Sequence, residues 1–353
     1  MCANRLEPGA ATYHEITHQT AAWVEAMAVV ANHRAAFTRL WAAGAYEQVL
    51  FTGCGSTYYL ATAAAALWNT LLDVPARAAP AGELYLYPSA TYGPGIGPRT
   101  LLVAVSRSGT TSETIAAARQ FKARGQGKVI VVTNDGHTPL AELGDITVAI
   151  PAGQEESVAQ TRSFASMYVA TTALTALLAG AESLLHEMAK LPVVGQELMA
   201  RYEPLAKTLG ANLTYDRFYF LGSGPRYGLA CEVNLKMKEM TLTHSEPFHF
   251  FEFRHGPMSM VNERAVVIGL VGDERRSQEL QVLHEMTALG GNTVALGETA
   301  RDVAFNSGLV QAAHNVLYLP VLQLLAYYRS IAKGLNPDRP ANLTAVIELD
   351  LDI

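Results

Sequence analysis

The sequence predicts an α/β fold that is built twice, with two parallel sheets that are each covered by helices. Three observations lead to this prediction. Short apolar runs of the length of buried strands alternate with helical segments along the chain. The order strand, glycine-rich loop, helix occurs at residues 48–72 and again at residues 218–240. The 353 residues are enough for two domains of ordinary size, each with its own core.

The first half begins with a segment of helical periodicity, residues 14–43, that contains few turn-forming residues. Buried strands are then expected at residues 48–52, 101–105, 129–133 and 146–150. A helix should follow the loop at 53–57 and run through residue 72, and another should cover residues 113–124. Strands that alternate with helices indicate a parallel sheet with both faces covered.

The pattern restarts in the second half. Strands are expected at residues 218–221, 266–270, 294–296 and 316–319, and helices at 227–240 and 277–289. Gly53-Cys54-Gly55 and Gly222-Ser223-Gly224 occupy the same place in the two halves, which indicates an internal duplication. With a boundary near residues 191–204, we expect one domain over residues 1–195 and a second over residues 196–353.

Composition and charge exclude several classes of protein. The net charge of −6 gives no reason to expect nucleic acid or an anionic membrane as a partner. Cys2, Cys54 and Cys231 are scattered without metal-ligand spacing, which is typical of a reducing compartment, and we expect no metal. Residues 1–9 lack the apolar run of a signal peptide, and the alanine-rich stretches 61–72 and 170–178 are too short to span a bilayer. We therefore expect a cytoplasmic protein.

Hydroxyl side chains cluster around Gly109, between the second strand of the first half and the next helix. They are those of Ser106, Ser108, Thr110 and Thr111. The N–H groups and positive dipole at a helix N-terminus suit a phosphate, and a glycine lets the backbone approach it closely. An ordinary helix cap is the alternative, but one cap needs only one hydroxyl. We favour a phosphate site.

Ser56 and Thr57 follow the first strand in the same way and are expected to form a second wall of this site. Ligands of open α/β sheets lie beyond the carboxyl ends of adjacent strands. Neither loop continues into the Gly-Lys-Ser/Thr of an NTPase, and Gly53-x-Gly55 lacks the third glycine of a dinucleotide site. We therefore expect a small phosphorylated ligand and no cofactor.

Candidate acid–base groups lie in the second half. Lys236 and Glu239 are three residues apart on a predicted helix, so they share a face and can meet one substrate, although a surface ion pair is the alternative. His255 precedes Gly256-Pro257, a turn that would hold its imidazole in place. Histidine titrates near neutral pH and suits proton transfer, whereas a packed structural histidine is the alternative.

Five motifs, in this order and spacing, together resemble the sugar isomerase (SIS) domain family. The resemblance is to the isomerase part of glucosamine-6-phosphate synthase and to stand-alone sugar-phosphate isomerases and aminosugar-phosphate deaminases. It covers nearly the whole chain and implies two tandem, flavodoxin-like three-layer αβα domains. The motifs are Glu15-Ile16 with Gln19, Gly53-Cys54-Gly55-Ser56-Thr57, Ser106-Arg107-Ser108-Gly109-Thr110-Thr111, Lys236-Met237-Lys238-Glu239 and Arg254-His255-Gly256-Pro257.

The resemblance also implies roles for individual residues. Glu239 would carry a proton between C1 and C2 of the sugar, and His255 would open the sugar ring. In the synthase this histidine comes from the neighbouring subunit, which implies a homodimer. The residues that would hold the sugar phosphate are Thr57, Ser106, Arg107, Ser108 and Thr111.

Two departures from the synthase pattern limit what can be carried over. Nothing around Cys2 resembles a glutaminase domain, and Ala345 stands where the synthase has a lysine in its C-terminal tail. We therefore expect a sugar-phosphate isomerase or an aminosugar-phosphate deaminase rather than a glutamine-dependent amidotransferase. A non-catalytic sugar-phosphate-binding regulator is the alternative, but the chain shows no basic helix-turn-helix segment.

Overall fold

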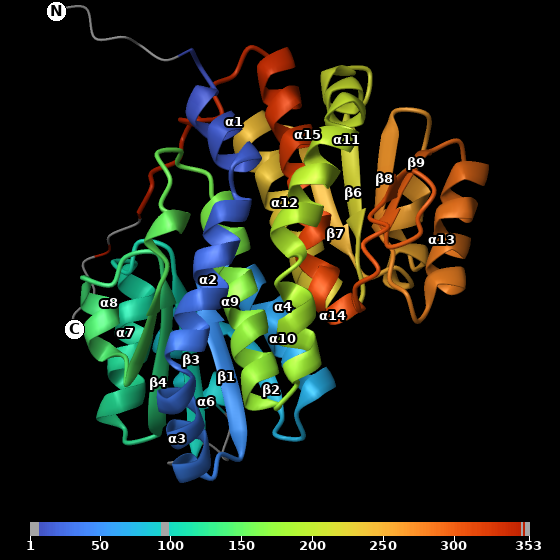
Figure 1. The fold of residues 1–353 in the computed structure, drawn as a ribbon. Helices are drawn as coiled ribbons and strands as arrows, with labels where there is room; N and C mark the ends of the chain where they lie inside the picture. Colours follow the sequence, from blue (N-terminus) through green and yellow to red (C-terminus); the bar gives the residue numbers. More distant parts are fainter. Residues whose placement is uncertain (1–6, 93–98, 347–348, 350–353) are drawn as a thin grey trace, which may run out of the picture. The chain divides into compact units, whose positions relative to one another are not determined.

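The computed structural model describes residues 7–92, 99–346 and 349, so Cys2 lies outside the described residues. Within them, the strands form two five-stranded sheets in which all neighbouring strands are parallel (Figure 1). The first sheet has the order β2-β1-β3-β4-β5, and the second, from its opposite edge, has the order β7-β6-β8-β9-β10. The same order in both sheets confirms the predicted tandem α/β fold.

The chain divides into two compact units, each built around one sheet. The first-sheet unit comprises the described residues of Ala21–Gln154, Ser163–Ala189 and Val346–Ile353. The second-sheet unit comprises those of Met1–Thr20, Glu155–Arg162 and Lys190–Ala345. Residues 191–204, where the sequence placed a domain boundary, lie within one helix, Leu191–Ala211.

The first sheet consists of β1 (Gln48–Gly53), β2 (Ala76–Pro80), β3 (Thr100–Ser106), β4 (Gly127–Thr133) and β5 (Ile146–Ala149). The helices that go with it are α2 (Thr20–Asn32), α3 (Arg34–Gly44), α4 (Ser56–Leu71), α5 (Ala81–Leu86), α6 (Pro88–Tyr92), α7 (Ser112–Ala123), α8 (Pro139–Leu143), α9 (Arg162–Leu178) and α10 (Glu182–Met188).

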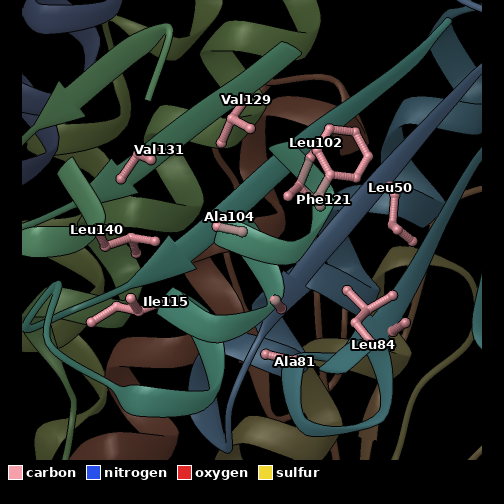
Figure 2. Packing of buried hydrophobic residues seen from close by; sticks show 13 residues of the cluster. Leu50, Ala81, Leu84, Leu102, Ala104, Ile115, Phe121, Val129, Val131 and Leu140 are labelled. Atoms are coloured by element: carbon pink, nitrogen blue, oxygen red, sulfur yellow. The ribbon is translucent and has the colours of Figure 1, made fainter. Parts of the chain in front are cut away.

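Helices cover the first sheet on both faces. On one face, Leu102 and Ala104 of β3 pack in a buried cluster that includes Phe121 of α7 (Figure 2). Phe51 of β1 points to the other face, where its ring contacts Trp68 of α4 at a centroid distance of 5.9 Å. Burying a side chain of this size contributes about 1.5–3 kcal/mol. Central strands that are buried on both faces read as continuous apolar runs, which is why the sequence revealed them.

The second sheet consists of β6 (Arg217–Leu221), β7 (His244–Phe248), β8 (Ala265–Leu270), β9 (Asn292–Gly297) and β10 (Val303–Ala304). The helices of this unit are α1 (Ala10–Thr17), α11 (Leu191–Ala211), α12 (Pro225–Thr241), α13 (Arg276–Ala288), α14 (Gln311–His314) and α15 (Tyr318–Ala332).

The structure corrects two predicted elements. Residues 316–319 were predicted as a strand, but they belong to the 3-10 turn Asn315–Leu317 and to the start of α15. A short apolar run is ambiguous because a buried helix and a buried strand look alike over four residues. The predicted helix at 14–43 is divided into α1, α2 and α3. No helix in the described ranges combines the length and apolarity needed to cross a membrane.

Candidate active site

The loops with the predicted phosphate ligands leave the first sheet where its strand order reverses. β1 pairs with β2 on one side and with β3 on the other, and the chain goes from β1 to β2 before it returns to β3. Residues 54–55 follow β1, and residues 107–111 follow β3. Because β1 and β3 are parallel neighbours, both loops lie at the carboxyl edge, at the point where open α/β sheets bind ligands.

The loop after β3 folds its hydroxyl groups around one glycine. Ser106 Oγ lies 3.2 Å from Thr111 Oγ1 and accepts a hydrogen bond from the Gly109 N–H. Ser108 Oγ accepts two hydrogen bonds from Thr110, one from the N–H at 3.2 Å and one from the Thr110 hydroxyl at 3.1 Å. Gly109 has φ +63°, and a Cβ there would lie 2.1 Å from Thr138 Oγ1, so a larger residue would disturb the loop. The predicted clustering of these hydroxyls is confirmed.

The loop after β1 is held by one of its own predicted ligands. Thr57 Oγ1 accepts a hydrogen bond from the Cys54 N–H and donates one to the Cys54 carbonyl, both at 2.9 Å. Thr57 and Ser56 are buried in the first turn of α4. Gly55, the N-cap of this helix, has φ +54°. The Thr57 side chain thus fixes the loop that surrounds the site.

Helices α4 and α7 both begin at this edge. In α4 the N–H groups of Thr57 and Tyr58 already donate to the Cys54 and Gly55 carbonyls, whereas in α7 the side chain of the N-cap Thr111 accepts no hydrogen bond from the first turn. The first N–H groups of a helix need partners, and an anion supplies them well. The half-buried Arg107 belongs to the same loop and adds a positive charge to it. This edge thus gathers helix N–H groups, hydroxyl groups and a positive charge in one place.

A buried lysine lies at the centre of the acid–base cluster on α12. Lys236 is only 1% exposed, and its Nζ lies 2.5 Å from Glu239 Oε2 and 3.4 Å from Glu232 Oε1. The side chain of Glu239 is 19% exposed, whereas that of Glu232 is 1% exposed. Glu239 is therefore the carboxylate of this cluster that solvent or a ligand can reach. The predicted common face of Lys236 and Glu239 is confirmed.

The charge on Lys236 is maintained by its carboxylate neighbours. Burial alone acts to lower its pKa, but the nearby charges of Glu232, Glu239 and Glu155 outweigh burial and raise the pKa above the ordinary value. The side chain therefore stays an ammonium ion at neutral pH. An ammonium ion beside Glu239 can orient this carboxylate.

Glu155 connects this cluster to the segment Glu155–Arg162 of the same unit. Its carboxylate accepts hydrogen bonds from the Thr161 N–H at 2.7 Å and from the Arg162 N–H at 2.6 Å. Buried Glu15 of α1 binds the segment at its other end, through the Glu156 N–H and the Ser157 hydroxyl. Burial, followed by the charge of Glu155, raises the pKa of Glu15. The segment is thus held in place by two carboxylates.

His255 lies in a fixed turn on the surface of the second-sheet unit. The preceding Phe253 is buried, with its ring 5.0 Å from that of Tyr219. Arg254 makes two hydrogen bonds to Glu285, at 2.7 and 2.6 Å. Gly256 follows with φ +123°. The backbone is therefore anchored on both sides of an exposed imidazole.

Within the two units, the predicted site residues form three groups. Ser56 and Thr57 with Ser106–Thr111 form the edge of the first sheet, Lys236 contacts Glu239 on α12, and His255 stands in its turn. Among the described contacts, none joins the His255 side chain to Lys236 or Glu239. Sequence reasoning missed Glu232 and Glu155. Glu232 could have been found from its spacing, because it lies four residues before Lys236 on the same predicted helix.

The chain matches the family model of the SIS domain over residues 45–177 and 214–323. It is 30% identical over 324 residues to the glutamine–fructose-6-phosphate aminotransferase (isomerizing) of Pseudomonas putida, a match that covers 86% of this chain and 52% of that protein. The corresponding protein of Pyrococcus horikoshii is 28% identical over 319 residues, with the same coverage. The chain therefore spans about half the length of the curated relatives it matches.

Solved structures are similar over almost the whole chain. A glucosamine-6-phosphate deaminase from Thermotoga maritima has a TM-score of 0.75 at 26% identity and covers 96% of this chain and 100% of its own. A tagatose-6-phosphate ketose/aldose isomerase from Escherichia coli has a TM-score of 0.83 at 21% identity and covers 95% and 98%, which shows a shared fold. One segment matched by the family model contains the first sheet and the other contains the second. The chain belongs to the SIS domain family.

Proposed function

We propose that the chain is an enzyme that moves a proton between C1 and C2 of a phosphorylated hexose or hexosamine. The observation that carries this proposal is the contact between the partly exposed Glu239 and the fully buried, charged Lys236. A carboxylate that a ligand can reach, oriented by a fixed cation, is suited to general acid–base catalysis.

Similar proteins suggest the class of substrate. Their names refer to fructose 6-phosphate, glucosamine 6-phosphate and tagatose 6-phosphate. Each of these has a 6-phosphate at one end and, in its open-chain form, an acidic C–H beside a carbonyl or imine at the other. The reaction is then an aldose–ketose isomerisation, or an isomerisation in which an aminosugar phosphate loses ammonia.

The proposed mechanism gives each group one task. The phosphate would be held by the loops of Ser56, Thr57 and Ser106–Thr111, which supplies orientation for the reaction at the other end of the sugar. His255 would transfer the proton that opens the sugar ring. Glu239 would then take the proton from one carbon and return it to the next through an enediol or enolamine. Lys236 would stay protonated and hold Glu239 in position.

The proposed protein is a cytoplasmic homodimer in which His255 contributes to the site of the partner subunit. Phe251 and Met260, which precede and follow His255 in the chain, are 51% and 53% exposed, so apolar side chains on this surface could meet a partner subunit beside the imidazole. The two described cysteines, Cys54 and Cys231, are free thiols, which fits a reducing compartment.

Incubation with a panel of hexose and hexosamine 6-phosphates tests the function. We expect a ketose or aldose product from at least one of them, with ammonia released if the substrate is an aminosugar. Calorimetry on the same panel measures binding separately. Binding without any product would instead identify a sugar-phosphate-binding regulator and would contradict the proposed enzyme.

A further inference from the structure

In the second sheet, the loop after β6 repeats the backbone geometry of the loop after β1. The N-caps Gly55 of α4 and Gly224 of α12 have φ and ψ of 54° and −122°, and of 58° and −135°. A Cβ on Gly53 would lie 2.7 Å from the carbonyl carbon of Thr57, and one on Gly222 would lie 2.7 Å from the carbonyl carbon of Arg226. In this alignment Arg226 takes the place of Thr57.

The loops after the third strand of each half also correspond. Residues 107–111 separate β3 from α7, and residues 271–275 separate β8 from α13, so the two loops have the same length. Gly272 then stands where the first half has Ser108. β6 and β8 are parallel neighbours, as β1 and β3 are. The second sheet therefore has its own reversal of strand order, where a ligand would be expected.

A carboxylate of the chain already occupies this second position. Glu279 in the first turn of α13 accepts a hydrogen bond from the Gly272 N–H through Oε2 at 2.6 Å. Its Oε1 lies 2.5 Å from Nη2 of Arg226, whose Nε donates to the Leu270 carbonyl at 2.9 Å. The side chains of Arg226 and Glu279 are 6% and 4% exposed. A negative group thus contacts both the loop N–H and the residue that corresponds to Thr57.

We propose that the second sheet contains a duplicate of the phosphate site, which the protein closes with the carboxylate of Glu279. The native chain then binds phosphate at the first sheet alone, an inference that rests on the proposed function for that half. The closed site also fixes the start of α12, the helix that carries Lys236 and Glu239, without the help of a ligand. Removal of the Glu279 carboxylate should open the second site to phosphate, with Arg226 as its cation.

Hydrogen exchange measured by mass spectrometry tests this proposal because it reports on each loop separately. The probe is inorganic phosphate, with chloride at equal ionic strength as the reference. In Glu279→Ala, we expect phosphate to slow exchange in residues 271–288 by about tenfold at a concentration ~10 times its dissociation constant. In the wild type, phosphate should not change the exchange rates of these residues. The double variant Arg226→Met/Glu279→Ala, which lacks the cation, should not respond.

Each contrary result is distinct. Protection of residues 271–288 by phosphate in the wild type would overturn the proposal, and this measurement does not depend on the folding of any variant. The proposal would also be overturned if Glu279→Ala folds but phosphate does not slow exchange in residues 271–288. The same holds if only acetate slows exchange there, because the position would then fit nothing but a carboxylate. Protection of residues 106–123 reports on the first site alone, so a failure there concerns the proposed function.

Discussion

Replacement of Lys236 by methionine removes the buried cation between Glu232 and Glu239. Two unit charges about 3 Å apart attract each other by about 5 kcal/mol at an effective dielectric constant of ~20, and the desolvation of both ions opposes this attraction. The removal of one partner leaves the other charges buried without compensation, which typically costs about 3–5 kcal/mol. We expect Lys236→Met to lower the free energy of unfolding of the second-sheet unit by this amount at neutral pH.

Arg34→Met provides the matched control because it breaks an ion pair of the surface. The side chains of Arg34 and Glu182 are 47% and 63% exposed, and an ion pair this open to solvent contributes little to stability. Urea unfolding should be followed by circular dichroism rather than by tryptophan fluorescence, since every tryptophan lies in the first-sheet unit. The tryptophans are Trp23, Trp41 and Trp68.

The pH dependence of the difference in unfolding free energy between the wild type and Lys236→Met provides a further check. The pKa of Lys236 is raised above its ordinary value of 10.5, so its stabilising effect is complete below that pH and is lost as the pH rises through the pKa of the folded state. The difference between the wild type and Lys236→Met should therefore hold at about pH 9 and shrink in more alkaline solution. A loss no larger than that of Arg34→Met would refute the reasoning.

Three further predictions concern other parts of the molecule. Ser108→Ala should raise the sugar-phosphate dissociation constant about tenfold or more in calorimetry, since a hydrogen bond to a charged group contributes about 1.5–3 kcal/mol, whereas the exposed Ser277→Ala should not change it. Tyr46→Phe should raise the free energy of unfolding by about 1 kcal/mol in fluorescence-monitored urea unfolding, because the Tyr46 hydroxyl is buried and has no hydrogen-bond partner among the described residues; destabilisation would contradict this. Burial raises the pKa of Tyr46 to about 12, so the wild type should also lose stability above pH 10, unlike the variant. A mixture of inactive Glu239→Gln and His255→Ala proteins should regain part of the activity through hybrid dimers; no activity after proven subunit exchange would exclude a shared site.

The sequence revealed the strands that are buried on both faces and missed three of the four described edge strands; β5 is the edge strand that it predicted. β3, with its seven consecutive buried residues, was predicted within one residue at each end. β2, β7 and β10 lie at sheet edges, and the sequence analysis did not predict them. β7 contains Pro247 and an exposed His244, and β2 contains an exposed Arg77. An edge strand pairs on one side only, so it tolerates proline and polar residues that hide the strand pattern.

Local spacing was enough to predict only the local parts of the candidate site. The contact between Lys236 and Glu239 follows from the helical repeat. The clustering of the hydroxyls around Gly109 follows from their position directly after a strand. The proximity of Glu155 to Lys236 depends on tertiary packing between segments far apart in the chain, and no local pattern encodes it. The same is true of Glu279 and Arg226, which are in contact although they lie 53 residues apart in the chain.

The central claim is that Glu239 transfers the proton between C1 and C2 of the substrate. NMR of the substrate in deuterium oxide tests it most directly, with Glu263→Gln as a control at an exposed glutamate of the same unit. The wild type and the control should incorporate deuterium at C1 or C2. Glu239→Gln should incorporate none and should lose about 10²–10⁴-fold in turnover, with little change in substrate affinity. Incorporation by Glu239→Gln at the wild-type rate would contradict the account and assign the base to another residue.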